Sequence, residues 1–201
     1  PSSGTSSDIS WTEKTIDVLT YWNNGLWNSK GLAFAIQMML MLLLGHVLAL
    51  SKPIDKLITQ LLPLCKNNAK SALLITLFTL LVSWFNWGLG LVFGAIFCKK
   101  IMEYAAKSSI ALNLGLIGAA GYSGLMIWHG GISGSSLVKI SEPGHLKDLA
   151  PESVKSIVPE LMDFSQTVFS SMNITITLSL LVLLPLTMYI LGKRAPIKIP
   201  E

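Results

Sequence analysis

Four long stretches of this chain carry no Lys, Arg, Asp or Glu, and they constrain its fold more than any other feature. They are residues 31–50, 71–98, 108–128 and 166–191. An uncharged apolar run of about 18 residues or more is long enough to cross a bilayer core of about 30 Å. Charged residues make up only 13% of the chain, whereas soluble domains carry about 25%. We therefore predict an all-α, polytopic membrane protein with four membrane-embedded segments.

The segment before the first uncharged stretch, residues 1–30, is polar with scattered aromatic side chains at Trp11, Trp22 and Trp27. Tryptophan prefers the membrane–water interface. This segment is therefore predicted to be either a periplasmic amphipathic helix that lies along the membrane or a plain surface helix that leads into the first span. The first span itself is assigned to residues 31–50.

Residues 51–70 carry four lysines against a single aspartate. Apolar residues recur within this stretch at the spacing of one helical face, from Ile54 to Leu62. A basic helix with one apolar face lies along a membrane surface rather than across it. We predict a cytoplasmic amphipathic helix over 51–70.

Residues 71–98 are too long for one ordinary span. As a single helix they would measure about 42 Å, which exceeds a bilayer core of about 30 Å. Their centre, SWFNWGLG at 83–90, is rich in glycine and polar groups, and such a break is tolerated only where the backbone is buried in protein or lines a cavity. Two alternatives follow. One is a long tilted helix, and the other is a re-entrant helical hairpin that turns between about residues 84 and 89.

The charges on the flanking loops favour the hairpin. Residues 51–70 have a net charge of +3 from four Lys and one Asp, and residues 99–107 have +2 from three Lys and one Glu. Cytoplasmic loops carry an excess of Lys and Arg. A hairpin puts both loops on that side, whereas a single crossing separates them. The other segments then agree, because 1–30 and 129–165 are negative and lie outside, while the cytoplasmic tail 193–201 is positive.

The third uncharged stretch is predicted to be a discontinuous helix. Glycine recurs every three residues from position 115 to position 124, a spacing that lets helices approach closely. The stretch runs into GYSGLMIWHGGISGSS at 121–136, where each glycine costs a helix about 1 kcal/mol. We predict a broken span over 108–136 that unwinds near its outer end. An outer loop at 137–165 and a last span at 166–191 follow.

The sequence contains no paired-carboxylate site, no phosphate-binding loop and no residues at metal-ligand spacing. Cys65 and Cys98 are predicted to be free thiols. The basic residues flank membrane segments, so topology explains them better than nucleic-acid binding does. We therefore predict that the chain is not an enzyme and has no cofactor, metal site or nucleic-acid partner.

The two broken segments form the candidate substrate site. Transporter sites are built near mid-membrane from discontinuous helices, whose N-termini carry free N–H groups and partial positive charge that suit an anion. A carboxylate site can therefore lack Arg and Lys. The predicted substrate-binding residues are Ser83, Asn86, Gly88 and Gly90 at the hairpin tip, with Tyr122, Ser123, His129, Gly130, Gly131, Ser133, Gly134 and Ser135 in the unwound segment.

These residue types also have purely structural explanations. The glycines could serve close helix packing alone. The tryptophans at 84, 87 and 128 either line a pocket for a short alkyl chain or anchor the chain at the membrane interface. Histidine is the side chain that changes charge near neutral pH, so His129 is either a proton-coupling group or a histidine at headgroup level.

Three blocks of the sequence resemble the bacterial short-chain fatty acid transporter family. They are GLWNSKGLAFAIQMMLMLLLGHVLA at 25–49, WFNWGLGLVFGA at 84–95 and GYSGLMIWHGGISGS at 121–135. Their order and spacing match the family, and MNITITLSLLVLLPL at 172–186 is similar too. The resemblance covers residues 20–192 and implies uptake of acetoacetate, butyrate and related acids across the inner membrane.

The resemblance also implies an architecture. Family members are about twice as long as this chain and are similar to the ion transporter superfamily, which has two inverted repeats with a re-entrant hairpin in each. This chain would then be most of the first repeat, and the second half of the same protein would be its partner. The resemblance further implies a homodimer and coupling to H⁺ or Na⁺. It supplies no binding residues, so the candidates above rest on physics alone.

These observations predict a multi-pass, cation-coupled secondary transporter of short-chain monocarboxylates that works by alternating access. Two alternatives stay open. One is a transporter of other organic anions such as dicarboxylates, which would be expected to need an embedded Arg or an added cation. The other is a non-transporting membrane scaffold, in which residues 71–98 form one continuous crossing and the glycines only pack helices.

Overall fold

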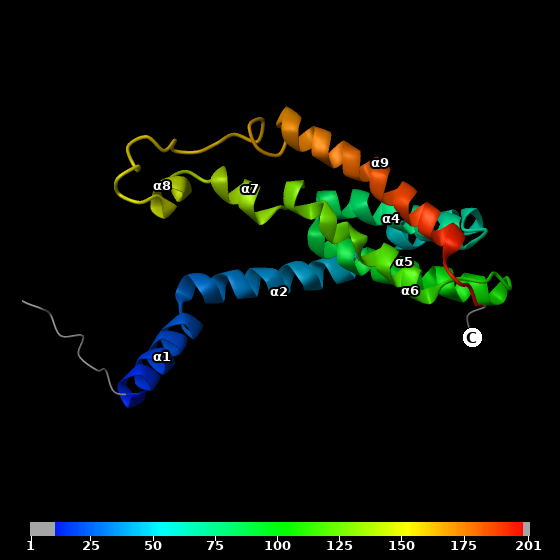
Figure 1. The fold of residues 1–201 in the computed structure, drawn as a ribbon, viewed down its shortest axis with the longest axis horizontal. Coiled ribbons are helices and arrows are strands. Elements are labelled where there is room, and N and C mark those ends of the chain that lie inside the picture. The colour runs from blue at the N-terminus through cyan, green and yellow to red at the C-terminus, as the bar shows by residue number, and fades with distance from the viewer. Residues whose placement is uncertain (1–10, 199–201) are drawn as a thin grey trace, which may run out of the picture. The chain divides into compact units, whose positions relative to one another are not determined.

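The computed structural model of this chain describes residues 11–198, apart from the side chains of Lys30, Ala49 and Ser135. Within this range the secondary structure is helical, with one isolated antiparallel bridge between Leu112 and Lys198. The predicted all-α fold is therefore confirmed. The α-helices are α1 (Trp11–Leu26), α2 (Ser29–Ala49), α3 (Lys52–Leu61), α4 (Asn68–Phe85), α5 (Trp87–Lys107), α6 (Leu114–Tyr122), α7 (Ser135–Ile140), α8 (His145–Leu149) and α9 (Ser171–Arg194), and short 3-10 turns are η1 (Leu62–Leu64), η2 (Ser123–Met126) and η3 (Trp128–Gly130) (Figure 1).

Three of the described helices are long and apolar enough to cross a membrane. The qualifying stretches are Gly31–Leu48 in α2, Asn68–Phe85 in α4 and Ser171–Arg194 in α9. This confirms that the chain is a membrane protein. The predicted span at 108–128 does not qualify, because its helix α6 has only nine residues and measures about 14 Å.

The chain divides into two compact units, residues 1–41 and residues 42–201. In the first unit, none of the residues of α1 is buried. Its tryptophans Trp11 and Trp22 are among the exposed side chains. The first third of the segment predicted at 1–30, residues 1–10, lies outside the described residues.

Helix α4 is the central helix of the second unit. Half of it is buried, against 11% of α9, because α5, α6 and α9 all pack against it. Figure 1 shows α9 running alongside α4. The buried residues of α4 include the hydroxyl-bearing Ser71, Thr76, Thr79 and Ser83. Polar side chains of membrane helices are expected to face protein in this way, since lipid offers them no hydrogen-bond partner.

The polar ends of these helices meet at one end of the second unit. Lys100 of α5 forms a salt bridge with Asp55 of α3. The buried side chain of Asn68 donates to the carbonyl oxygen of Gly192 at 2.8 Å and accepts the N–H of Asn113 at 2.8 Å. We call this region the basic end, because the three positively charged segments of the described chain lie together there: 51–70, 99–107 and 193–198.

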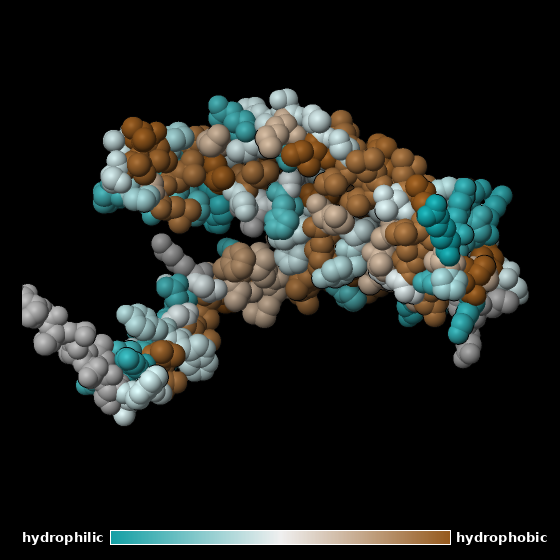
Figure 2. Space-filling view, in the orientation of Figure 1, coloured by the Kyte–Doolittle hydropathy of each residue, from teal (hydrophilic) through white to brown (hydrophobic). Residues whose placement is uncertain are grey.

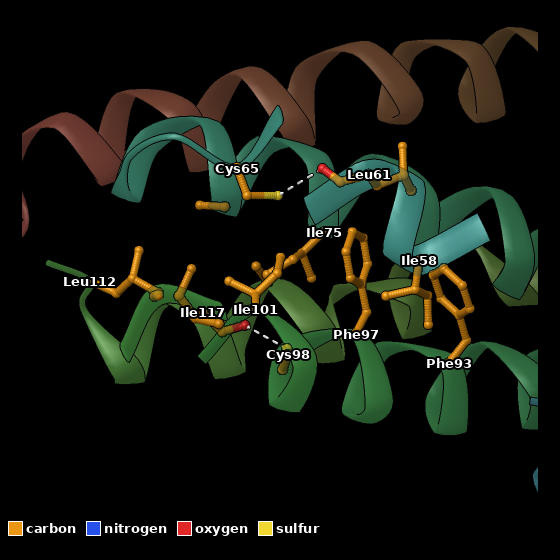
Figure 3. Close-up of a cluster of buried hydrophobic side chains, with 13 residues drawn as sticks. Ile58, Leu61, Cys65, Ile75, Phe93, Phe97, Cys98, Ile101, Leu112 and Ile117 are labelled. Carbon is orange, nitrogen blue, oxygen red and sulfur yellow. Dashed lines mark hydrogen bonds between the residues drawn. The ribbon is translucent and has the colours of Figure 1, made fainter. Parts of the chain in front are cut away.

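A cluster of buried apolar side chains joins α3 to α5. Phe93 and Phe97 are fully buried, and their ring centroids lie 5.6 Å apart. Figure 3 shows Ile58 of α3 pointing toward these two rings. Fully burying an apolar side chain of this size contributes about 1.5–3 kcal/mol in water. This packing holds α3 against the middle of α5.

The amphipathic helix predicted over 51–70 is shorter in the structure. Helix α3 ends at Leu61, and α4 begins at Asn68. The two local causes are Pro63, which has no N–H to continue the helix, and Asn67, whose side-chain oxygen accepts a backbone N–H at the start of α4 and so caps it.

Other predicted boundaries also shift. The predicted outer loop at 137–165 contains α8 and most of α7, which begins two residues before it. The last span was predicted from residue 166, but α9 begins at Ser171 because the hydroxyl of Ser170 caps its first turn. Helix α6 is shorter than the broken span predicted over 108–136, because the glycine-rich chain turns to 3-10 geometry from Ser123 onwards.

The two native thiols are expected to react very slowly with N-ethylmaleimide. Cys65 and Cys98 are both buried and free, and burial raises the pKa of the Cys65 thiol to about 11. The reactive form is the thiolate, so labelling of Cys65 at pH 7 should be about a hundredfold slower than that of free cysteine and should accelerate as the pH rises. Mass spectrometry of a labelling time course measures this. Rapid modification of both thiols at pH 7 would contradict the packing in Figure 3.

Candidate substrate site

The hairpin predicted within 71–98 breaks at a single residue, Asn86. Helix α4 ends before it and α5 begins after it, and its backbone is extended (φ −150°, ψ 119°). The side-chain oxygen of Asn86 accepts the N–H of Leu89 at 2.9 Å. The backbone N–H of Asn86 donates to the carbonyl oxygen of Val82 at 2.9 Å. Asn86 therefore closes one helix and caps the next.

The unwound segment lies directly against this tip. The hydroxyl of Ser133 accepts the N–H of Trp87, the first residue of α5, at 3.1 Å. The N–H of Ile132 donates to the carbonyl oxygen of Trp84 at 2.9 Å. The rings of Trp87 and Trp128 lie 5.5 Å apart between centroids. The fold therefore brings together the two broken segments that the sequence singled out.

Glycines hold this junction tightly packed. Ser83 is buried, and a Cβ atom placed at Gly90 or Gly124 would come within 2.7 Å or 3.0 Å of the Ser83 Cβ. A Cβ atom at Gly131 would come within 2.9 Å of the carbonyl carbon of Trp84. Contacts this short force a neighbour to move. At these positions the absence of a side chain allows backbone and side chain to approach closely.

Three other candidates have different environments. Ser123 is buried, and its hydroxyl donates to the carbonyl oxygen of Ala120 at 2.7 Å. His129 is exposed and stacks on Trp128 with ring centroids 4.0 Å apart. Tyr122 is 65% exposed. It follows Gly118 by four residues, so the two lie on the same face of α6. A Cβ atom at Gly118 would point into open space, so this face points away from the packed unit. The structure therefore places Tyr122 outside the junction.

The remaining candidates are backbone positions or lie partly outside the described residues. Gly88 is buried in the first turn of α5, and a Cβ atom at Gly45 of α2 would lie 3.2 Å from its carbonyl carbon. Gly134 is buried and packs against the carbonyl oxygen of His129. Ser135 begins α7, but its side chain lies outside the described residues.

A cavity of about 300 Å³ lies between the unwound segment and α9. His129 and Gly130 line it from one side, and Asn173 and Thr177 of α9 line it from the other. The side-chain nitrogen of Asn173 donates to the carbonyl oxygens of Gly130 at 2.8 Å and Val168 at 2.7 Å. The sequence-based candidates omitted Asn173 and Thr177. The sequence feature that could have identified them is a polar side chain inside an otherwise apolar span.

Replacing Asn173 with alanine is expected to loosen the unwound segment. The change removes two hydrogen bonds, each worth about 0.5–1.5 kcal/mol, so the free energy of unfolding should fall by about 1–3 kcal/mol. Thermal unfolding of the purified protein in detergent measures this. Thr175→Ala is the matched control, because its exposed hydroxyl bonds only the carbonyl oxygen of Ser171 in the same helix. Equal melting temperatures for the two variants would contradict the bridging role.

The side chains of the junction carry no permanent charge. Residues 83–90 and 121–136 contain no Lys, Arg, Asp or Glu, and the described residues contain no group of three or more His, Cys, Asp or Glu that could hold a metal ion. The main electrostatic feature of the junction is the N-terminus of the 21-residue helix α5, which carries partial positive charge from the helix dipole. This arrangement suits binding of a small anion through N–H and hydroxyl groups.

The sequence profile of a family described as "Short chain fatty acid transporter" matches residues 9–198. The chain belongs to this family. The match confirms the resemblance seen in the sequence blocks. The matched range includes the hairpin tip at 83–90 and the unwound segment at 121–136.

Two curated relatives both carry the name "Putative short-chain fatty acid transporter". The protein from Haemophilus influenzae is 34% identical over 180 residues, which cover 88% of this chain and 38% of the relative. The protein from Escherichia coli is 33% identical over 170 residues, which cover 85% of this chain and 36% of the relative. This chain therefore spans less than two fifths of the length of these relatives. No solved structure matches it.

Proposed function

We propose that this chain is part of a secondary transporter that carries short-chain monocarboxylates, such as butyrate and acetoacetate, across the bacterial inner membrane. The observation that carries the proposal is the junction of two chain breaks, joined by the hydrogen bond from Trp87 N–H to Ser133. Broken segments that meet in this way are typical of transporter sites. Membership of the family and the names of the relatives support the same substrate class.

The substrate carboxylate binds at the N-terminus of α5 and takes over the hydrogen bond that Ser133 makes. The amides at the start of this helix are bonded to neutral oxygens, those of Ser133 and Asn86. An ionised oxygen forms a stronger hydrogen bond than a neutral one, so a carboxylate can displace the hydroxyl. The Trp87 and Trp128 rings offer apolar surface to the short alkyl chain.

The hairpin enters and leaves the membrane on the cytoplasmic side. Gly90 lies against Ser83 and Gly94 lies against Thr79, so the two arms run antiparallel and their free ends lie on the same side. The Lys100–Asp55 salt bridge supports the same-side placement, since it ties the C-terminal half of α5 to α3, the helix that precedes α4. At the tip, Trp84 packs against Phe169 with ring centroids 6.5 Å apart, just before α9 begins.

Transport by alternating access requires the part of the protein beyond this chain, because sites of this kind lie between two repeats. A gradient of H⁺ or Na⁺ drives the cycle. His129 lies at the cavity beside the junction and is the candidate group for proton coupling.

Uptake of labelled butyrate by the full-length protein in proteoliposomes tests the proposal. Protein-free liposomes are the necessary control, because neutral butyric acid crosses lipid unaided. We expect protein-dependent uptake under an H⁺ or a Na⁺ gradient, and uptake about tenfold lower for Asn86→Leu, which removes the α5 cap. No protein-dependent uptake under either gradient, from folded protein, would refute the proposal.

Competition separates monocarboxylates from dicarboxylates. Excess unlabelled acetoacetate should suppress butyrate uptake, whereas succinate should not, because the junction at 83–90 and 121–136 contains no Lys or Arg to pair a second carboxylate. Stronger suppression by succinate than by acetoacetate would assign the site to dicarboxylates instead.

A further inference from the structure

A second cavity, of about 480 Å³, lies at the basic end of the second unit. It is open to the surface and is lined by the start of α4, the α5–α6 connection and the end of α9. Lys66 and Lys193 contribute to its wall, together with the polar side chains of Asn67 and Ser109. The lining residues in the described part of the chain include no Asp or Glu. The cavity is therefore positively charged.

An apolar groove of about 340 Å³ adjoins this cavity. Leu64, Leu73 and Leu74 line it, with Lys70 beside them. Tyr189 of α9 lines both the groove and the cavity. The positively charged cavity and the leucine-lined groove therefore share Tyr189 as a lining residue.

The position of the lysines suits the headgroup level of a membrane. Lys193 follows the long uncharged stretch of α9 directly, and its ammonium lies 4.7 Å from the ring centroid of Tyr189. Figure 2 shows hydrophilic side chains gathered at this end, next to the hydrophobic surface of α9. Within residues 11–198 neither Lys66 nor Lys193 pairs with a carboxylate. Their charges are available to a ligand.

We infer that the cavity and groove together bind one anionic phospholipid, with its phosphate beside Lys66 and Lys193 and an acyl chain in the groove. Basic pockets between membrane helices on the cytoplasmic side hold anionic headgroups in this way. A soluble carboxylate or phosphate would use the lysines but would leave the groove of Leu73 and Leu74 empty. The charge therefore specifies an anion, and the groove specifies a lipid.

Native mass spectrometry of the full-length protein in detergent tests this inference, with dioleoylphosphatidylglycerol and dioleoylphosphatidylcholine as probes. We expect phosphatidylglycerol to bind more tightly than phosphatidylcholine, and Lys66→Ala/Lys193→Ala to weaken phosphatidylglycerol binding about tenfold. The control Lys52→Ala/Lys56→Ala removes the same charge from exposed positions of α3 outside the cavity and should leave binding unchanged. Lys66→Arg/Lys193→Arg keeps the charge and should retain binding, which excludes a folding defect as the cause.

The groove is tested separately with Leu74→Trp, which fills it and should displace phosphatidylglycerol while leaving the lysines in place. Glycerol phosphate, added in excess, should not compete. Equal binding of the two lipids, an equal loss in the Lys52/Lys56 control, or full competition by glycerol phosphate would each overturn the inference. The last result would assign the cavity to a soluble anion, and the first would show that the lysines do not select an anionic headgroup.

Discussion

Gly94→Ala is expected to destabilise the second unit by about 3 kcal/mol, at the upper end of the cost of overpacking a close helix contact. A Cβ atom at Gly94 would overlap the carbonyl oxygen of Gly121 and come within 3.0 Å of its carbonyl carbon, with the Thr79 methyl at 3.1 Å. The obstacle is backbone on α6, so no side-chain rotation relieves it. Helices α5 and α6 must separate. Thermal unfolding in detergent measures the loss.

Gly118→Ala is the matched control for this prediction. Gly118 lies in α6 one turn from Gly121, but beyond the backbone of its own helix nothing lies within 4 Å of the position its Cβ would take. Alanine there should gain up to about 1 kcal/mol from its higher helix propensity. The two glycine-to-alanine changes should therefore shift the melting temperature in opposite directions. A Gly94→Ala protein as stable as the wild type would mean that α5 and α6 do not pack as closely as described.

Gly131→Ala is expected to reduce substrate uptake about tenfold or more, because small displacements of binding groups have large effects on rate. A Cβ atom at Gly131 would overlap the carbonyl oxygen of Trp84. That oxygen accepts the N–H of Ile132, so the unwound segment must move away from the hairpin tip. The Ser133 hydroxyl would then leave Trp87 N–H. Butyrate uptake by the full-length protein in proteoliposomes measures the effect.

Gly115→Ala controls for a general effect of losing a glycine. The only neighbour of a Cβ atom there is the Asn113 side-chain oxygen, at an ordinary contact distance of 3.5 Å. Its uptake should stay close to that of the wild type. If Gly131→Ala transports at the rate of Gly115→Ala, and both proteins are folded, the junction of tip and unwound segment has no part in transport.

The sequence predicted the break in 71–98 but not its position within SWFNWGLG. Glycine and asparagine both weaken a membrane helix, so the cluster indicated a break. The structure breaks the chain only at Asn86, whose side chain caps α5. Gly88 and Gly90 lie inside α5, where Gly90 makes room for Ser83. A helix tolerates glycine when close packing compensates, and this compensation comes from distant residues that local patterns do not reveal.

Residues that work through long-range contacts were the hardest to predict. Asn173 bonds the carbonyl oxygen of Gly130, 43 residues away, and the sequence alone does not say that α9 runs beside η3. Tyr122 was a candidate by its position in the glycine-rich stretch, but the helical turn before the unwinding point directs it outward. The end of α3 was also missed by the helix predicted over 51–70, although Pro63 and Asn67 are ordinary helix-ending and helix-starting residues.

In the proposed mechanism, a carboxylate replaces the Ser133 hydroxyl at the start of α5. Substrate protection of Ser133→Cys from alkylation tests this replacement most directly in the full-length protein. The native thiols of this chain are buried and should not be alkylated on the same timescale. Ser136→Cys, exposed in α7, is the control. We predict that butyrate slows alkylation at position 133 at the concentrations that saturate uptake and has no effect at position 136. An unchanged alkylation rate at position 133 under saturating butyrate would contradict the claim.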